Sequence, residues 1–324
     1  MRAMRVSELG DIDQLRLEET TVPKPGPGQV RITMEAAGVN FPDILMISGH
    51  YQMRPELPFS PGAEVAGVVS GVGDGTTLFA AGDRVVGTPY FGAFAEEVLV
   101  PEAACESIPD DLASTDAAVL PLAFGTALYA LRNRGRLQPG DSLLVTGATG
   151  GVGSAAVKLG KLMDAYVIAA VGNPEKADVA RSMGADDVVT YGSDASLRDA
   201  MKALHPRGAD VILDNVGGDV MGEALRCVAW EGRILVVGFT SGAIPQLPAN
   251  LLLLKGSSVV GVFYGRWREH DPEASSAQFA ELAQWVIDGE LDPGVSKTYP
   301  LADAVSALQA IQDRSARGKL VIVP

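Results

Sequence analysis

A glycine-rich turn at residues 147–153, GATGGVG, is the pattern with the clearest chemical meaning in this chain. An apolar segment expected to form a buried strand, 142–146, precedes it, and apolar residues at helical spacing follow it. In such a strand–turn–helix, glycines let the backbone approach a pyrophosphate, and the N–H groups at the helix start attract the anion. The turn therefore predicts a dinucleotide site that uses Gly147, Ala148, Thr149, Gly150, Gly151, Val152 and Gly153.

The end of the next expected strand, 166–171, indicates which dinucleotide is bound. Sites for NAD usually place an acidic residue there, about 20 residues after the turn, to bind the ribose 2′-hydroxyl. This chain has Gly172 and Asn173 instead, and Lys176 follows within one helical turn. A lysine suits a 2′-phosphate, and Tyr191 at the end of the third expected strand adds a hydroxyl donor. We therefore expect NADPH rather than NADH.

The elements that must position this turn change character along the chain. The first third is β-rich, with strands expected at 30–37, 65–72 and 84–87 between turn signals. After residue 113, helical segments alternate with strands expected at 142–146, 166–171, 188–191, 211–214, 234–237 and 259–263. Such alternation is typical of a parallel sheet covered on both faces. We expect an α/β protein with a Rossmann, doubly wound parallel sheet inserted into a β-rich, barrel-like domain.

Composition limits the classes of partner. The chain has 324 residues and a formal net charge of −14, and no basic patch offsets it, so we expect no nucleic acid partner. Its two cysteines, Cys105 and Cys227, are too few for a disulfide framework. No unbroken apolar run is long enough for a bilayer, and the N-terminus lacks the pattern of a signal peptide. We expect no membrane partner and a cytoplasmic location.

Several further motifs together resemble the zinc-independent quinone oxidoreductase family, the zeta-crystallin-like branch of the medium-chain dehydrogenase/reductases. They cover essentially the whole chain: GVNFPD at 38–43, PGAEVAG at 61–67, GDRV at 82–85, the glycine turn, VGG at 216–218 and GK at 318–319. The resemblance implies a GroES-like catalytic domain, 1–124 plus 264–324, and a Rossmann domain, 125–263. It also implies a homodimer through an edge strand near 257–262.

The resemblance implies further cofactor contacts beyond the glycine turn. These contacts come from Thr126, Gly172, Lys176, Tyr191, Asn215, Phe239, Phe263 and Lys319, with Tyr264 beside Phe263 as a wall of the nicotinamide pocket. The zinc alcohol dehydrogenases of the same superfamily have a cysteine and a histidine where this chain has Asn40 and Ala63. Neither residue is a plausible zinc ligand in this setting, so we expect no metal.

Without a metal to stabilise an alkoxide, the expected reaction is hydride transfer from NADPH to a small-molecule quinone or another conjugated carbonyl. Its catalytic candidates lie at 40–51: the Asn40 amide as donor, Asp43 as an anchor for water or the ribose, and the Tyr51 phenol as donor or acid. The alternative for Tyr51 is packing against Pro55 and Pro58.

Two other functions remain open from the sequence. One is a 2-enoyl thioester reductase, which Tyr51 favours because these related enzymes have a proposed acid at the matching tyrosine. The acidic composition offers little support for the coenzyme A or carrier-protein substrate of such an enzyme. The other is an NADPH-binding protein without significant turnover.

Overall fold

The computed structural model describes residues 1–192 and 196–324, and the chain divides into two compact units. We call them the seven-stranded unit and the six-stranded unit, after the main sheet of each. The seven-stranded unit comprises Met1–Leu122, Phe279–Gly289 and Pro293–Pro324, and the six-stranded unit comprises Ala123–Gln278 and Glu290–Asp292. Each unit is described by itself.

The six-stranded unit contains a fully parallel sheet in the order β10-β9-β8-β11-β12-β13. The chain begins at the central strand β8, proceeds outward to β10, and then crosses to β11 on the other side of β8. Strands β8 and β9 are buried almost throughout, as expected for a sheet covered on both faces. The bounds are β8 Ser142–Thr146, β9 Tyr166–Val171, β10 Asp187–Thr190, β11 Ala209–Asp214, β12 Val228–Val236 and β13 Ser258–Gly261.

Helices cover both faces of this sheet. The helix α4 packs closely, because a Cβ added at Gly160 would lie 2.7 Å from Leu143 and 2.9 Å from Val167. The adjacent strand residues Leu144 and Ile168 belong to a buried cluster with α6 and α7. Successive strand side chains point to opposite faces, so α4 and the α6–α7 pair flank the sheet. The bounds are α4 Gly151–Leu162, α5 Ala177–Ser182, α6 Leu197–Leu204, α7 Gly218–Cys227, α8 Ala249–Lys255, α9 Tyr264–His270 and α10 Pro272–Ile287.

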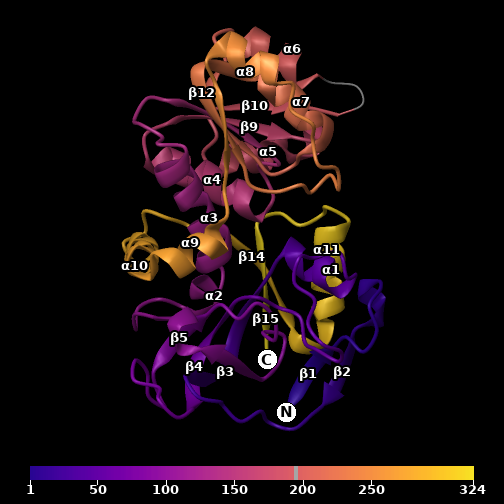
Figure 1. Ribbon diagram of the computed structural model, residues 1–324, viewed down its shortest axis with the longest axis vertical. Helices are drawn as coiled ribbons and strands as arrows, with labels where there is room; N and C mark the ends of the chain where they lie inside the picture. The colour runs from indigo at the N-terminus through magenta and orange to yellow at the C-terminus, as the bar shows by residue number, and fades with distance from the viewer. Residues whose placement is uncertain (193–195) are drawn as a thin grey trace. The chain divides into compact units, whose positions relative to one another are not determined.

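The seven-stranded unit contains a mixed sheet in the order β14-β15-β3-β4-β5-β7, with β6 also paired to β3 (Figure 1). Only β14 and β15 run parallel, so the end of the chain returns to complete a sheet that its first third began. Strands β1 and β2 form a separate antiparallel pair. The bounds are β1 Arg2–Arg5, β2 Arg16–Glu19, β3 Gln29–Val39, β4 Val65–Val72, β5 Arg84–Gly87, β6 Glu97–Pro101, β7 Cys105–Ser107, β14 Val295–Pro300 and β15 Lys319–Val323.

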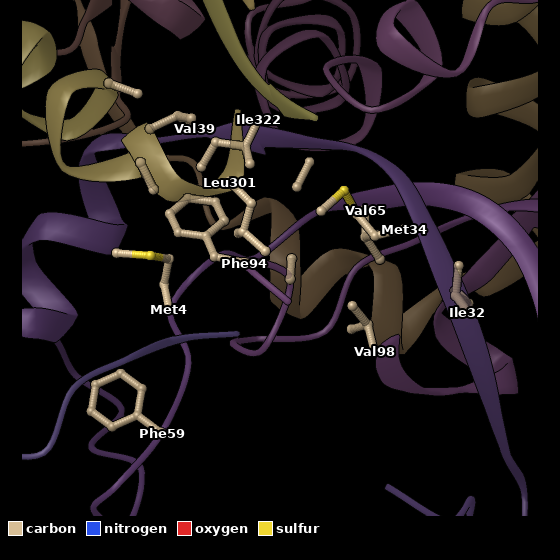
Figure 2. Close-up of a cluster of buried hydrophobic side chains, with 14 of the residues drawn as sticks. Met4, Ile32, Met34, Val39, Phe59, Val65, Phe94, Val98, Leu301 and Ile322 are labelled. Atoms are coloured by element: carbon tan, nitrogen blue, oxygen red, sulfur yellow. The ribbon is translucent and has the colours of Figure 1, made fainter. Parts of the chain in front are cut away.

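The core of this unit joins segments that are distant in sequence. Figure 2 shows Met4, Val65, Phe94, Leu301 and Ile322 in one buried cluster of side chains. Helices α1 (Phe41–Ile47) and α11 (Ala304–Gln312) contribute further members of the cluster. Burial of this apolar surface holds the C-terminal strand against the N-terminal strands.

One helical stretch, Ser114–Arg134, is long and apolar enough to cross a membrane by length and composition, and 72% of its apolar window is buried inside the protein. Short polar breaks interrupt its apolar residues, so it contains no unbroken apolar run of that length. Buried core helices pass the same test of composition. The stretch includes two α-helical segments, α2 Ser114–Ala117 and α3 Gly125–Leu128, and two π-helical segments, η3 Leu120–Phe124 and η4 Tyr129–Arg134.

The predicted Rossmann sheet with helices on both faces is confirmed. One local prediction was wrong, because the strand expected at 259–263 ends at Gly261. Residues 41–47, for which the sequence analysis predicted no element, form helix α1. The domain boundaries at 124/125 and 263/264 remain a prediction. The compact six-stranded unit itself extends to Gln278.

Candidate functional site

The first group of candidate residues lies at the carboxyl edge of the six-stranded sheet. The strand order reverses between β8 and β11, and the crevice at such a switch point is where open α/β sheets bind ligands. The glycine turn follows β8, Gly172 follows β9 and Asn215 follows β11. The parallel sheet therefore brings together residues that the sequence separates by more than 60 positions.

The glycines of the turn serve different purposes. Gly147 has a φ of +60°, a conformation that side chains disfavour. A Cβ on Gly153 would lie 2.1 Å from the Gly147 carbonyl oxygen, so the close approach of α4 requires a glycine there. Gly150 has an ordinary φ of −78°, and an added Cβ would meet only the Gly147 carbonyl oxygen, at 3.4 Å. Among the described residues, neither a close contact nor a positive φ requires residue 150 to be glycine.

Gly150 is also the N-cap of α4, and no side chain caps that helix end. The first N–H groups of a helix have no partner within the helix itself. Together with the positive end of the helix dipole, they favour an anion. The exposed Gly150 and the half-buried Gly151 and Val152 present these groups at the switch point.

A buried side-chain pair holds the two central strand ends together. The Thr146 hydroxyl donates to Asp214 Oδ1 at 2.5 Å, and the Gly217 N–H donates to Asp214 Oδ2 at 3.0 Å. Asn215 donates from Nδ2 to the Thr146 carbonyl oxygen at 3.1 Å. Burial raises the pKa of Asp214 above its ordinary value. Our sequence analysis missed Thr146 and Asp214, whose one signal is a polar residue at the last position of an apolar strand.

Of the residues predicted to bind the 2′-phosphate, the structure places Tyr191 beside Gly172, and Lys176 follows on a short helix. Tyr191 donates its N–H to the Val171 carbonyl oxygen at 3.1 Å, and its ring lies beside Gly172. Gly172 is exposed, and Lys176 is half-buried at the end of the short helix η5 (Pro174–Lys176). Positions 172 and 173 are occupied by glycine and asparagine, so neither offers an acidic side chain.

The aromatic candidates take different positions. Tyr264 is buried, its ring is tilted against the rings of Tyr129 and Trp267, and it lies against Gly125. Phe263 is 64% exposed and caps α9. Phe239 packs on Gly217, where an added Cβ would lie 2.7 Å from the Phe239 ring, and Thr126 is half-buried on α3. Within this unit, therefore, Phe263 and Phe239 present aromatic surface, whereas Tyr264 belongs to an internal aromatic cluster.

The second group lies in the seven-stranded unit, around a buried lysine. The Lys319 ammonium donates to Asn40 Oδ1 at 2.7 Å, to Glu64 Oε1 at 3.1 Å and to the Val39 carbonyl oxygen at 3.4 Å. Glu64 also accepts from Asn40 Nδ2 at 2.8 Å and from the Leu122 N–H at 3.0 Å. Lys319 is 2% exposed and Glu64 is fully buried. In the sequence analysis Glu64 appears only as part of the PGAEVAG motif at 61–67.

Asp43 and Tyr51 lie next to this network. The Asp43 carboxylate is buried at the start of α1, where it accepts the Asn40 N–H at 2.8 Å. Burial, with a smaller contribution from Glu64, raises the pKa of Asp43 from 3.8 to about 7. Tyr51 is half-buried against the core, and burial and the charge of Asp43 raise its pKa. The phenol therefore keeps its proton at neutral pH and can donate a hydrogen bond.

Metal ligands do not gather in the part of the chain that the structure describes. No group of three or more His, Cys, Asp or Glu side chains there could hold a metal ion. The family resemblance implies that Asn40 and Ala63 match the positions of zinc ligands in related enzymes. The Asn40 amide oxygen already accepts from an ammonium, and Ala63 has no side-chain donor atom. A cation beside Lys319 would meet strong like-charge repulsion.

Comparison with known proteins places this architecture. Residues 26–110 match the alcohol dehydrogenase GroES-like domain, and residues 151–286 match the family model described as zinc-binding dehydrogenase. The GroES-like domain and the Rossmann sheet of the predicted fold are thereby confirmed.

Relatives match over nearly the whole chain. Quinone oxidoreductase-like protein 2 of Bos taurus is 39% identical over 95% of this chain and 88% of its own length. The quinone oxidoreductase of Rattus norvegicus is 32% identical over 100% and 98%, respectively. The solved structure of Escherichia coli quinone oxidoreductase complexed with NADPH has a TM-score of 0.92 at 28% identity and covers both chains completely.

The raised pKa of Asp43 predicts how stability depends on pH. Between its ordinary pKa of 3.8 and about 7, the unfolded chain releases this proton and the folded chain keeps it. The free energy of unfolding should therefore fall as the pH rises through this window, by up to about 4 kcal/mol, and level off above it. Asp43→Asn should flatten this slope in urea titrations at a series of pH values. The exposed control Asp110→Asn should keep it, and an unchanged slope in Asp43→Asn would contradict the assignment.

Proposed function

Because this chain belongs to the quinone oxidoreductase-like family of the medium-chain dehydrogenase/reductases, we propose that it reduces a quinone or another conjugated carbonyl without zinc. The chain is an NADPH-dependent oxidoreductase, as its sequence predicts. The acceptor class and the independence from zinc are the parts that we propose.

Gly150 is the observation that carries this proposal furthest. Its backbone conformation is ordinary and its surroundings leave room for a side chain, so the fold leaves this glycine unexplained. A ligand that needs the bare backbone of the helix start explains it. The site residues fit NADPH: the turn offers N–H groups to a pyrophosphate, and the end of β9 lacks the acid that would repel a 2′-phosphate.

The absence of zinc from the proposed mechanism rests on what occupies the matching positions. Asn40 is hydrogen-bonded to Lys319 and Glu64. The Lys319 ammonium already neutralises the Glu64 carboxylate, so a metal ion at this place would have to displace the ammonium. The residues therefore do not fit zinc, and we derive no step through a metal.

When bound, NADPH supplies the hydride, and the chain supplies binding, orientation and a proton. The Thr146–Asp214 pair holds the loops after β8 and β11 in place. A hydride added to a conjugated carbonyl leaves negative charge on its oxygen. We propose that Tyr51, which its raised pKa keeps protonated, donates a hydrogen bond or its proton to that oxygen.

A panel of acceptors tests the proposal. We expect NADPH oxidation, followed at 340 nm, with 1,4-benzoquinone or 9,10-phenanthrenequinone, and little change after dialysis against a chelator. Tyr51→Phe should lower turnover of conjugated ketones by about tenfold or more while the Kd for NADPH stays near the wild-type value. Oxidation with crotonyl-coenzyme A alone would favour the thioester reductase. Tight NADPH binding with no oxidation would favour the protein without turnover.

Substitutions of two glycines of the turn, Gly150 and Gly153, should distinguish an effect on folding from an effect on cofactor binding. Gly150→Ala should weaken NADPH binding by about tenfold and lower the Tm less than Gly153→Ala does, because its Cβ would meet only the Gly147 carbonyl oxygen, at 3.4 Å. Gly153→Ala should lower the Tm by several degrees, because its Cβ would lie 2.1 Å from the Gly147 carbonyl oxygen. Fluorescence titration with NADPH and thermal melts measure the two effects. Equal loss of affinity and Tm in both variants would contradict this division.

We also propose that the chain forms a homodimer through β13. This strand ends the sheet order, and the Val262 N–H bonds inward to Val236, so the backbone of Val259 points outward. Nearby Leu253 is 81% exposed and Trp230 is 69% exposed. These features suit a second copy paired edge to edge.

Removing one outward donor should separate the subunits. Val259→Pro lacks the outward N–H and should elute as a monomer in size-exclusion chromatography with light scattering. Val259→Ala retains that N–H and should remain a dimer. A monomeric wild type would refute the proposal.

A further inference from the structure

Lys319 has no N–H group left for an external ligand. Its ammonium has three protons, and three oxygen acceptors lie within 3.4 Å: Val39 O, Asn40 Oδ1 and Glu64 Oε1. The side chain is 2% exposed. The family resemblance predicts a cofactor contact for Lys319, whereas the geometry commits its charge to the protein interior.

The network also fixes the Asn40 amide. An ammonium can only donate and a carboxylate can only accept, so Asn40 Oδ1 must face Lys319 and Nδ2 must face Glu64. The second Nδ2 proton points toward the Gly38 carbonyl oxygen at 3.4 Å. Both amide protons of Asn40 are thus directed at acceptors of the chain, and Asn40 is poorly suited to donate to a substrate.

Asn40 connects this network to Tyr51. It is the N-cap of α1, and its N–H donates to Asp43 within the first turn of the helix. At the other end of α1, the Tyr51 N–H donates to the Leu45 carbonyl oxygen at 3.0 Å. A shift of Asn40 would therefore move α1 and, with it, the phenol of Tyr51.

We infer that Lys319 and Glu64 are a positioning pair, which sets the place of Asn40, α1 and Tyr51 for proton donation, and that neither Lys319 nor Asn40 contacts cofactor or substrate. This inference rests on the proposed reductase function. Removing one partner of the pair leaves an uncompensated buried charge, whereas removing both leaves none.

Three variants test the pair. Lys319→Met should lower the Tm and lower kcat at saturating NADPH by about tenfold or more, because Glu64 loses its counter-ion and Asn40 loses its partner. The Kd for NADPH should change by less than about twofold. Adding Glu64→Gln to Lys319→Met should restore Tm and kcat toward the wild type. Lys158→Met is the matched control: it breaks the ion pair with Asp292 elsewhere in the chain and should leave kcat and the Kd for NADPH unchanged.

Two results would overturn the inference. A Kd for NADPH raised about tenfold, with kcat at saturation unchanged and no rescue by Glu64→Gln, would make Lys319 a cofactor contact. A lower Tm with normal kcat, measured well below the Tm of each variant, would make the pair a stability element only. If the wild type oxidised NADPH with none of the acceptors in the panel, the proposed function would be refuted. In that case the pattern of Tm and NADPH Kd still decides between a buried pair and a cofactor contact.

Discussion

A charged side chain out of contact with water must be surrounded by opposite charge and hydrogen-bond acceptors, and the seven-stranded unit is arranged around one such group. The Lys319 ammonium on β15 reaches Val39 at the end of β3, Asn40 at the start of α1 and Glu64 just before β4. The last strand of the chain thus meets three segments from its first fifth. Gly38 is part of the same arrangement, since a Cβ there would lie 2.1 Å from Glu64 Oε1.

The six-stranded unit meets a different requirement. The carboxyl ends of parallel strands lie along one edge of the sheet. The loops that leave this edge have no strand ladder to satisfy their backbone, so side chains must hold them. A hydroxyl–carboxylate pair, Thr146 and Asp214, holds the two loops at the switch point, and Asp214 also accepts the Gly217 N–H. Further along this edge, Gly218 donates to the Ala243 carbonyl oxygen, which ties the loop after β11 to the loop after β12.

Local sequence was sufficient for the elements whose signal is local. The glycine turn, its flanking strand and the helix behind it were predicted because apolar period and glycine spacing act within about 20 residues. Helix α1 was not predicted because 41–47 is short and begins with Phe41 and Pro42. Its N-cap Asn40 was considered as a catalytic donor and as a residue at a zinc-ligand position, but not as a helix cap. The Lys319–Glu64 pair spans 255 residues, and no local pattern indicates which lysine meets which glutamate. The family resemblance drew attention to Lys319, but its surroundings required the structure.

Three of the four glycines of the turn, Gly147, Gly150 and Gly153, look equivalent in the sequence motif but differ in what the structure requires of them. Backbone conformation maintains Gly147 and close packing maintains Gly153, so any descendant that still folds this way is expected to keep both. Neither constraint applies to Gly150, and the ligand that we propose would maintain it. In a lineage that abandoned the cofactor, selection would therefore relax at one position and persist at its neighbours. Residue 150 is thus the position at which loss of binding would first become visible in an inherited sequence.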